Sequence, residues 1–171
     1  MIDRHFHFPS AVQAGIALGS NLGNSRKIFE QAIQQLNKIH NGLPDAFLVS
    51  SFYETIPVNC PPNSPNFLNA VIQLETSLSS YDLINFLQKI EAESGRPLPR
   101  IQNAPRTLDL DLLYHGTSTL ATERLTLPHP RILEREFVLK PLSEIAPFFT
   151  LPGWRKNAKE YLLDSIINKT K

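Results

Sequence analysis

The chain has 171 residues, of which 42% are hydrophobic and 19% are charged, and its formal net charge is +1. This length suits one domain with a single core, and the composition excludes a disordered or fibrous chain. A net charge near zero argues against the strongly basic overall surface of a nucleic-acid or anionic-membrane binder and leaves a local basic patch open. A single cysteine, Cys60, excludes an intramolecular disulfide or a cysteine zinc cluster.

The beginning of the chain predicts a tail, a strand and a helix. We expect residues 1–12 to form a flexible tail, since chain ends are poorly ordered unless they are tied down. The apolar run over residues 14–19 predicts a central strand that is buried on both faces. Apolar residues at helical spacing predict a helix over residues 25–39, with Asn24 or Ser25 as its cap.

Two more strands and a second helix are predicted next. Residues 47–53 have strand character, and the prolines over residues 57–65 predict a loop. Residues 67–75 alternate between two faces, and we expect the face with the even-numbered residues to be core. Ser79 caps a helix whose apolar positions fall over residues 83–90.

The remaining elements are a strand, a strand pair and a terminal helix. Residues 108–114 predict a strand, and residues 120–127 are expected to pair near it. Residues 128–147 predict mostly irregular or short-helical structure, because prolines interrupt them. Asn157 and Glu160 have the spacing that caps a last helix.

The order of these elements predicts the fold class. Strand, helix, strand, strand, helix, strand is the order of the ferredoxin-like α+β fold, an antiparallel sheet with helices packed on it. We therefore expect αβα layers. The absence of a repeat or linker in the sequence predicts a single domain over residues 13–171.

Two carboxylates mark the strand over residues 108–114. The strand period of two puts Asp109 and Asp111 on one face, about 7 Å apart at their Cα atoms. Two acids side by side on an apolar strand repel each other and lose hydration, which favours a bound cation. Magnesium suits such a pair because it prefers oxygen ligands. The alternative is an exposed strand face with solvated acids.

Arginines cluster around the two aspartates. The guanidinium group is a planar fork of donors that matches phosphate oxygens, so carboxylates and arginines together predict a polyphosphate site. The alternative for any single arginine is a surface ion pair with a neighbouring glutamate. Six of the nine arginines fall within forty residues: Arg96, Arg100, Arg106, Arg124, Arg131 and Arg135.

Three further segments carry polar candidates. Residues 19–24 read either as a phosphate loop or as a tight turn with a helix cap, and they lack the lysine of a Walker A motif. Asn69 beside Phe67 offers donors, an acceptor and an aromatic surface, which suit a flat heterocycle. The alternative is a solvent-facing amide beside a half-buried ring. His129, between two prolines, is either structural or a ligand contact.

Taken in chain order, the motifs resemble the hydroxymethyldihydropterin pyrophosphokinase family. The resemblance implies transfer of pyrophosphate from ATP to 6-hydroxymethyl-7,8-dihydropterin, which gives AMP and the pterin diphosphate for folate biosynthesis. It also implies two Mg²⁺ ions, with ATP as co-substrate. The resemblance covers residues 14–147 and is carried by GSNLGN, SSFYET, NFLNAV, ESGR, APRTLDLDLL, ERLTLPHPR and EREFVLKPLSEIAP.

The resemblance also implies roles for individual residues. Asp109 and Asp111 would bind the metal ions and act in catalysis with Arg96 and Arg106. The pterin ring would lie between two aromatic side chains. Nucleotide binding is implied for Gln88, Glu91, Arg106, Leu112, Arg124, Thr126, His129 and Arg135. Pterin binding is implied for Thr55, Ile56, Val58, Phe67, Asn69, Asp109 and Phe137.

The sequence departs from the family in one loop. Many members carry Trp-Gly where this chain has Asn103 and Ala104, so a stacking role is not carried over to Asn103. Basic residues of the family are also replaced by Leu98 and Pro99. We expect the loops over residues 56–65 and 95–105 to act as lids that exclude water.

Two other classes of protein are weaker alternatives. A sugar-nucleotide transferase needs a larger nucleotide domain, and an RNA-binding module needs exposed aromatics and a basic face. The resemblance implies the pterin and ATP as partners, while the charge balance argues against nucleic acid and an anionic membrane as partners. With no apolar run of about 18 residues and one cysteine, we expect a cytoplasmic protein. The sequence does not determine the oligomeric state, for which a monomer is the working expectation.

Overall fold

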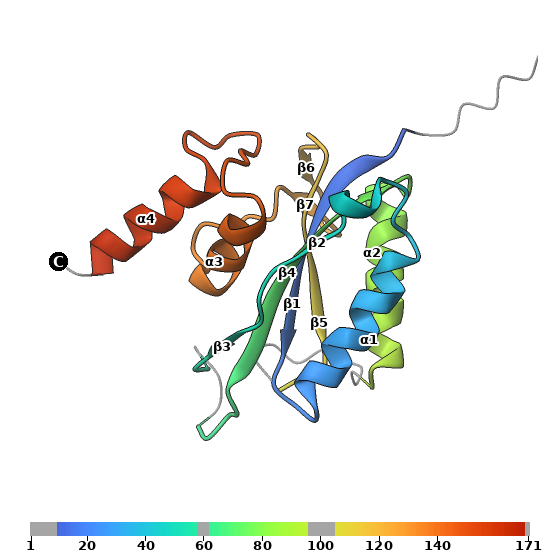
Figure 1. Ribbon diagram of the computed structural model, residues 1–171, viewed down its shortest axis with the longest axis vertical. Helices are drawn as coiled ribbons and strands as arrows, with labels where there is room; N and C mark the ends of the chain where they lie inside the picture. Colours follow the sequence, from blue (N-terminus) through green and yellow to red (C-terminus); the bar gives the residue numbers. More distant parts are fainter. Residues whose placement is uncertain (1–9, 58–61, 96–104, 170–171) are drawn as a thin grey trace, which may run out of the picture.

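The computed structural model describes residues 10–57, 62–95 and 105–169 (Figure 1). The predicted tail up to residue 9, most of the second predicted lid, and Val58, Arg96, Arg100 and Asn103 lie outside the described residues. The described chain forms an antiparallel sheet with strand order β2-β4-β1-β5, and β3 also pairs with β4. The strands are β1 (Val12–Ser20), β2 (Leu48–Val49), β3 (Tyr53–Thr55), β4 (Phe67–Thr76) and β5 (Asp109–His115).

Helices cover both faces of this sheet, which confirms the predicted ferredoxin-like α+β class and its αβα layers (Figure 1). One face carries α1 (Ser25–Asn37) and α2 (Ser80–Glu93). On the opposite face α3 (Glu136–Ile145) packs against β4, and α4 (Ala158–Lys169) packs against α3. A short helical turn, η1 (Pro44–Ala46), and a separate hairpin of β6 (Leu120–Ala121) and β7 (Thr126–Leu127) complete the described elements.

Strand β4 is buried on both faces. The even-numbered side chains Ala70, Ile72 and Leu74 pack in the core beneath α1 and α2, as predicted. The other face is also buried. Asn69 is only 5% exposed and Val71 is fully buried, because α3 covers this side. The alternative of a solvent-facing Asn69 is therefore wrong. Its amide needs protein partners in a buried place.

The predicted helix caps are confirmed where local chemistry decides them. Asn24 rather than Ser25 caps α1, and its side chain accepts a hydrogen bond from the Lys27 amide at 3.0 Å. Ser79 caps α2 in the same way. Asn157 and Glu160 form a reciprocal pair at the start of α4, with backbone-to-side-chain distances of 3.0 and 2.8 Å.

Several predicted boundaries differ from the structure. Val12, assigned to the tail, pairs with Thr76 in β1. The helix predicted over 25–39 ends at Asn37. The strand predicted over 47–53 is two strands, because Ser50 interrupts the ladder. Residues 128–147 contain a regular ten-residue helix, α3, which accommodates Pro141 in its interior.

No helix in the described part of the chain is long and apolar enough to cross a bilayer.

Candidate active site

The two aspartates of β5 point to the same face of the sheet as α3. Leu110 and Leu112, which alternate with them, pack in the core beneath α1 and α2. The Nε atom of Arg106 lies 2.9 Å from an Asp109 carboxylate oxygen, and Nη1 of Arg135 lies 3.0 Å from an Asp111 oxygen. The side chains of Asp109 and Asp111 are 19% and 35% exposed, so neither is a freely solvated surface acid.

A bulge in β5 fixes the segment that follows the hairpin. The register between β1 and β5 shifts so that Leu113 is an extra residue, and its carbonyl accepts a hydrogen bond from the His129 amide at 2.7 Å. The Arg131 amide donates to Nδ1 of His129 at 3.1 Å, so the neutral imidazole carries its proton on Nε2. The cis peptide bond between Leu127 and Pro128 lies just before this contact.

The ionisation state of His129 follows from its surroundings. Burial lowers its pKa, the Asp111 carboxylate raises it, and the guanidinium groups of Arg135 and Arg131 lower it again. The pKa therefore lies below the ordinary value of 6.5. At neutral pH the ring is an uncharged donor through Nε2.

A cavity of about 280 Å³ opens between α2, β5 and the β6–β7 hairpin. Asp111 lines it, together with an apolar wall that includes Leu87 and Leu125. This is close to the lower end of small-molecule site volumes, about 300 Å³. The cavity brings together five residues predicted to bind nucleotide: Gln88, Leu112, Arg124, Thr126 and His129.

Arg124 is anchored at the cavity by α2. Its guanidinium group donates to the Asn85 side chain and lies 5.8 Å from the centre of the Tyr81 ring. The Tyr81 hydroxyl lies 3.3 Å from the hydroxyl of Thr122 on the hairpin. The hairpin is therefore tied to α2 at two points, which the sequence did not indicate.

The other three predicted nucleotide residues do not line the cavity. Arg106 and Arg135 instead form ion pairs with Asp109 and Asp111. Glu91 is 1% exposed, and its carboxylate accepts a hydrogen bond from the Leu110 amide at 2.9 Å. This contact holds α2 against the strand that carries the aspartates.

A second polar cluster lies across β1 from Asp109. Gly19 pairs with Asn69 on one side and with Asp109 on the other. A Cβ atom at Gly19 would lie 3.8 Å from Asp109 Cβ and 3.9 Å from Asn69 Oδ1, on the same face as both. The glycine therefore leaves the floor between the amide and the carboxylate open.

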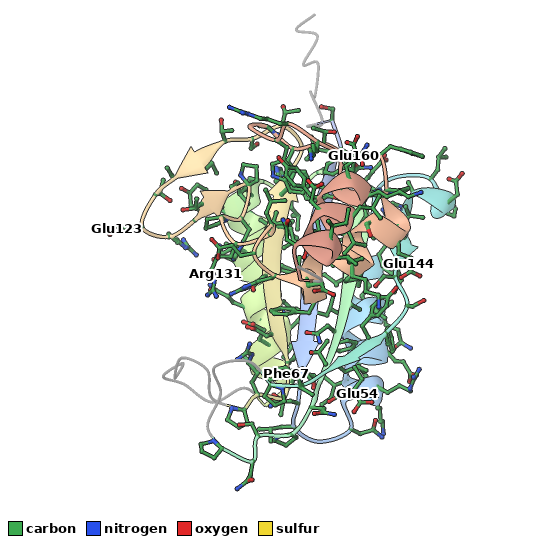
Figure 2. All side chains as sticks on the ribbon, turned by 90° about the vertical axis from the view of Figure 1, so that its left-hand side faces the viewer. Glu54, Phe67, Glu123, Arg131, Glu144 and Glu160 are labelled. Carbon is green, nitrogen blue, oxygen red and sulfur yellow. The ribbon has the colours of Figure 1, made fainter. Side chains whose placement is uncertain are left out.

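The Asn69 side chain is held by the edge strand. Its Nδ2 atom donates to Thr55 Oγ1 at 2.8 Å and to the Tyr53 carbonyl at 3.4 Å, which leaves Oδ1 as an acceptor. Phe67, 8% exposed, lies 5.1 Å beneath the Arg106 guanidinium carbon. The strand register and these contacts thus bring Asn69, Phe67 and Thr55 together at one end of β4. Figure 2 labels Phe67 at this end.

The remaining predicted pterin residues differ in position. Phe137 belongs to α3, where the Arg135 guanidinium carbon lies 5.8 Å from its ring centre. Ile56 is 74% exposed, beyond the end of β3. Val58 and the catalytic candidate Arg96 lie outside the described residues.

The loop over residues 19–24 is a tight turn rather than an open phosphate cradle. The amides of Asn21 and Leu22 both donate to the Arg106 carbonyl, at 3.0 and 3.2 Å, and Gly23 has a φ of 73° that favours glycine. Asn21 Oδ1 accepts from the Arg106 amide at 2.8 Å. Asn21, which sequence reasoning missed, therefore orients the segment that carries Arg106.

Comparison with known proteins identifies the family. Residues 15–147 match the sequence profile described as 7,8-dihydro-6-hydroxymethylpterin-pyrophosphokinase (HPPK). The chain belongs to the HPPK family. This membership confirms the predicted resemblance and the prediction of a diphosphotransferase enzyme, and it sets aside the sugar-nucleotide transferase and the RNA-binding module.

Individual HPPK relatives cover most of the chain. The 2-amino-4-hydroxy-6-hydroxymethyldihydropteridine pyrophosphokinase of Haemophilus influenzae is 41% identical over 142 residues, 83% of this chain and 86% of that protein. The Bacillus subtilis protein of the same name is 42% identical over 132 residues, 77% of each chain. A crystal structure of wild-type Plasmodium falciparum HPPK-DHPS has a TM-score of 0.71 at 14% identity, covering 92% of this chain and 45% of that one. This last likeness shows the HPPK fold alone.

Proposed function

We propose that this HPPK transfers pyrophosphate from ATP to 6-hydroxymethyl-7,8-dihydropterin in folate biosynthesis. The observation that carries the proposal is the position of the aspartate pair between the cavity beside α2 and the polar cluster around Gly19. Asp111 lines the cavity beside α2, and Asp109 adjoins Gly19, which separates it from Asn69 on the next strand. Such a pair is suited to act on a phosphate chain that reaches from one ligand to the other.

The carboxylates fit magnesium. Among the described residues there is no group of three or more histidine, cysteine, aspartate or glutamate side chains that could hold a metal by itself. Magnesium commonly takes one or two carboxylates and completes its shell with water and substrate phosphates, which matches Asp109 and Asp111. We propose that this pair holds two Mg²⁺ ions, which when bound would neutralise charge on the phosphates.

The nucleotide is proposed to bind in the cavity beside α2. Arg124 and the Nε2–H group of His129 can donate to phosphate oxygens, while Gln88 and Thr126 offer neutral polar contacts. Leu112 contributes to the apolar wall. Arg106 and Arg135 are proposed to donate both to the aspartates and to the phosphates. Glu91 is proposed to support the nucleotide site indirectly, through its hydrogen bond to the Leu110 amide of β5.

The pterin is proposed to bind over Gly19. Asn69 Oδ1 is the acceptor for an N–H edge of the ring, because both Nδ2 hydrogens face the edge strand. Phe67 and Phe137 supply aromatic surfaces, and Thr55, Ile56 and Val58 border the ring. The pterin hydroxyl oxygen forms a bond to the β-phosphorus and releases its proton to solvent. The bond from that phosphorus to the α–β bridging oxygen breaks, and AMP leaves with that oxygen.

One assay tests this function. Purified protein is incubated with ATP, magnesium and 6-hydroxymethyl-7,8-dihydropterin, and AMP is followed by chromatography. We expect AMP and pterin diphosphate in equal amounts, and none when the pterin is omitted or EDTA is added. Absence of AMP, or equal AMP without the pterin, would show the proposal to be wrong. Light scattering tests the accompanying proposal of a monomeric enzyme, and fractionation of cells tests its cytoplasmic location.

A further inference from the structure

Glu144, near the end of α3, joins that helix to the edge of the sheet. Its carboxylate oxygens both lie 3.0 Å from the Ser51 amide, and they accept hydrogen bonds from the Ser51 hydroxyl and the Tyr53 hydroxyl, each at 2.8 Å. Lys140, one turn earlier, lies 4.8 Å from the centre of the Tyr53 ring. Figure 2 shows Glu144 on the side of the sheet that carries α3.

The Ser51 amide is free for this contact because the strand is broken beside it. The Ser50 amide donates to the Val71 carbonyl, and Ser50 Oγ accepts from the Val71 amide, both at 3.0 Å. This exchange ends β2 at Val49 and restarts the ladder at Tyr53. The Ser51 amide is a backbone donor outside the sheet ladder, and the Glu144 carboxylate accepts its hydrogen bond. Hydrogen bonds to a charged acceptor are stronger than those to a neutral one.

The segment held by Glu144 is the one that orients Asn69. Tyr53 pairs with Asn69 in the β3–β4 register, and its carbonyl and the Thr55 hydroxyl accept the Asn69 amide. On the helix side, Phe137 precedes Glu144 by seven residues, which is two turns and the same helix face. One carboxylate therefore connects the helix that carries Phe137 with the strand that fixes Asn69.

We propose that Glu144 is a positioning residue for the pterin half of the site. It sets the spacing between α3 and the β3–β4 edge, and so the width of the slot between Phe137 and Asn69. This inference rests on the proposed function. Glu144 does not line the cavity beside α2, so its loss is expected to leave the nucleotide half intact.

The test separates the two substrates. In Glu144→Gln an amide replaces one acceptor oxygen and faces donors, so we expect KM for the pterin to rise about tenfold. We expect kcat and the Kd for ATP to stay within about twofold, because the nucleotide contacts are untouched. Glu30→Gln is the matched control, an exposed glutamate on α1 across the sheet, and it should match wild type in every constant.

A second variant secures the result against misfolding. Tyr53→Phe removes a single donor, and we expect a rise in pterin KM of about threefold. The double variant should be no worse than Glu144→Gln alone, because both remove the same contact. Circular dichroism and ATP binding report the fold. The direct Kd of the pterin with a non-hydrolysable ATP analogue gives the same comparison without turnover.

Three results would overturn the inference: an unchanged pterin KM in both single variants, an equal loss of ATP affinity, or effects that multiply in the double variant. A wild-type protein that binds the pterin but forms no AMP would instead overturn the proposed function, and pterin binding by Glu144→Gln would still decide the inference.

Discussion

The side chain of Tyr114 on β5 packs directly over Gly15 on β1 and reaches toward β4. Gly15 pairs with Gln73 on β4 and with Tyr114 on β5, and the Tyr114 hydroxyl donates to Gln73 Oε1 at 2.7 Å. Tyr114 and Gln73 are 1% and 6% exposed, so this bond lies in the interior. A Cβ atom at Gly15 would lie 2.2 Å from Tyr114 Cε1 and 2.5 Å from Cζ. Gly15→Ala therefore requires the ring to leave its place.

The size of the effect follows from these contacts. Carbon atoms approach to about 3.5 Å, so the ring must move by more than about 1 Å. Overpacking of this kind costs about 1–3 kcal/mol, and a Gln73 oxygen left without its donor costs about 1–3 kcal/mol more. The reduced freedom of the unfolded alanine chain offsets about 0.4–1 kcal/mol. We expect the free energy of unfolding to fall by about 2–5 kcal/mol.

Urea unfolding followed by the fluorescence of Trp154 measures this loss, since the single tryptophan packs against the cluster that contains Tyr114. Gly19→Ala is the control on the same strand, because its nearest neighbours would lie at 3.8 and 3.9 Å, an ordinary contact. We expect the control to stay within about 1 kcal/mol of wild type. The reasoning is refuted if Gly15→Ala is as stable as the control. It is also refuted if Gly15→Ala lowers the free energy of unfolding equally in wild type and in a Tyr114→Leu background, where the clashing ring is absent.

Three further predictions concern the site. Asp111→Asn should lower kcat by at least about a hundredfold with the circular dichroism spectrum unchanged, and near-normal turnover would remove the metal assignment. Asn69→Ala should raise pterin KM by about 10–100-fold without changing ATP affinity, and an equal effect on both substrates in binding titrations would contradict its role. Burial raises the pKa of Glu144, but hydrogen bonds from Ser51 and Tyr53 outweigh it and hold the pKa below its ordinary value of 4.5. The stability that these bonds contribute is therefore present above pH 4.5 and lost as pH falls through the folded pKa. The difference in free energy of unfolding between wild type and Glu144→Gln should become smaller in acid, and a difference that does not change with pH would contradict this.

Much of the fold could be predicted because its signals are local. The caps at Asn24, Ser79 and Asn157 depend on partners three residues away, so the sequence itself shows them. The alternation of β4 is equally local. The bounds and regularity of helix α3 could not be predicted, because Pro141 argues against a helix and the N-terminal cap has no side-chain bond. Burial of Val138 and Leu142 against the sheet, which is a tertiary contact, stabilises it instead.

The site divides in the same way. Asp109 and Asp111 share a face through the strand period alone, and their pairing on one side of β5 needed no knowledge of the fold. The contacts that hold the site together are distant in sequence: Asn21 meets Arg106 across 85 residues, and Glu144 meets Ser51 across 93. Neither residue type is distinctive by itself, so no local pattern could single them out.

Helix α3 is held by such distant contacts at both of its ends. At its start Arg135 binds Asp111, at its first turn Phe137 stands beside that arginine, and at its last turn Glu144 binds the edge strand. Successive helical residues differ by about 100° in direction, so a slip of one residue would break the first and last contacts together. Two polar contacts, made by residues nine positions apart at the two ends of α3, therefore fix both its rotation and its position. Loss of Arg135 should then act through Asp111 on the nucleotide side, whereas loss of Glu144 acts on the pterin side, although the two residues lie at the two ends of α3.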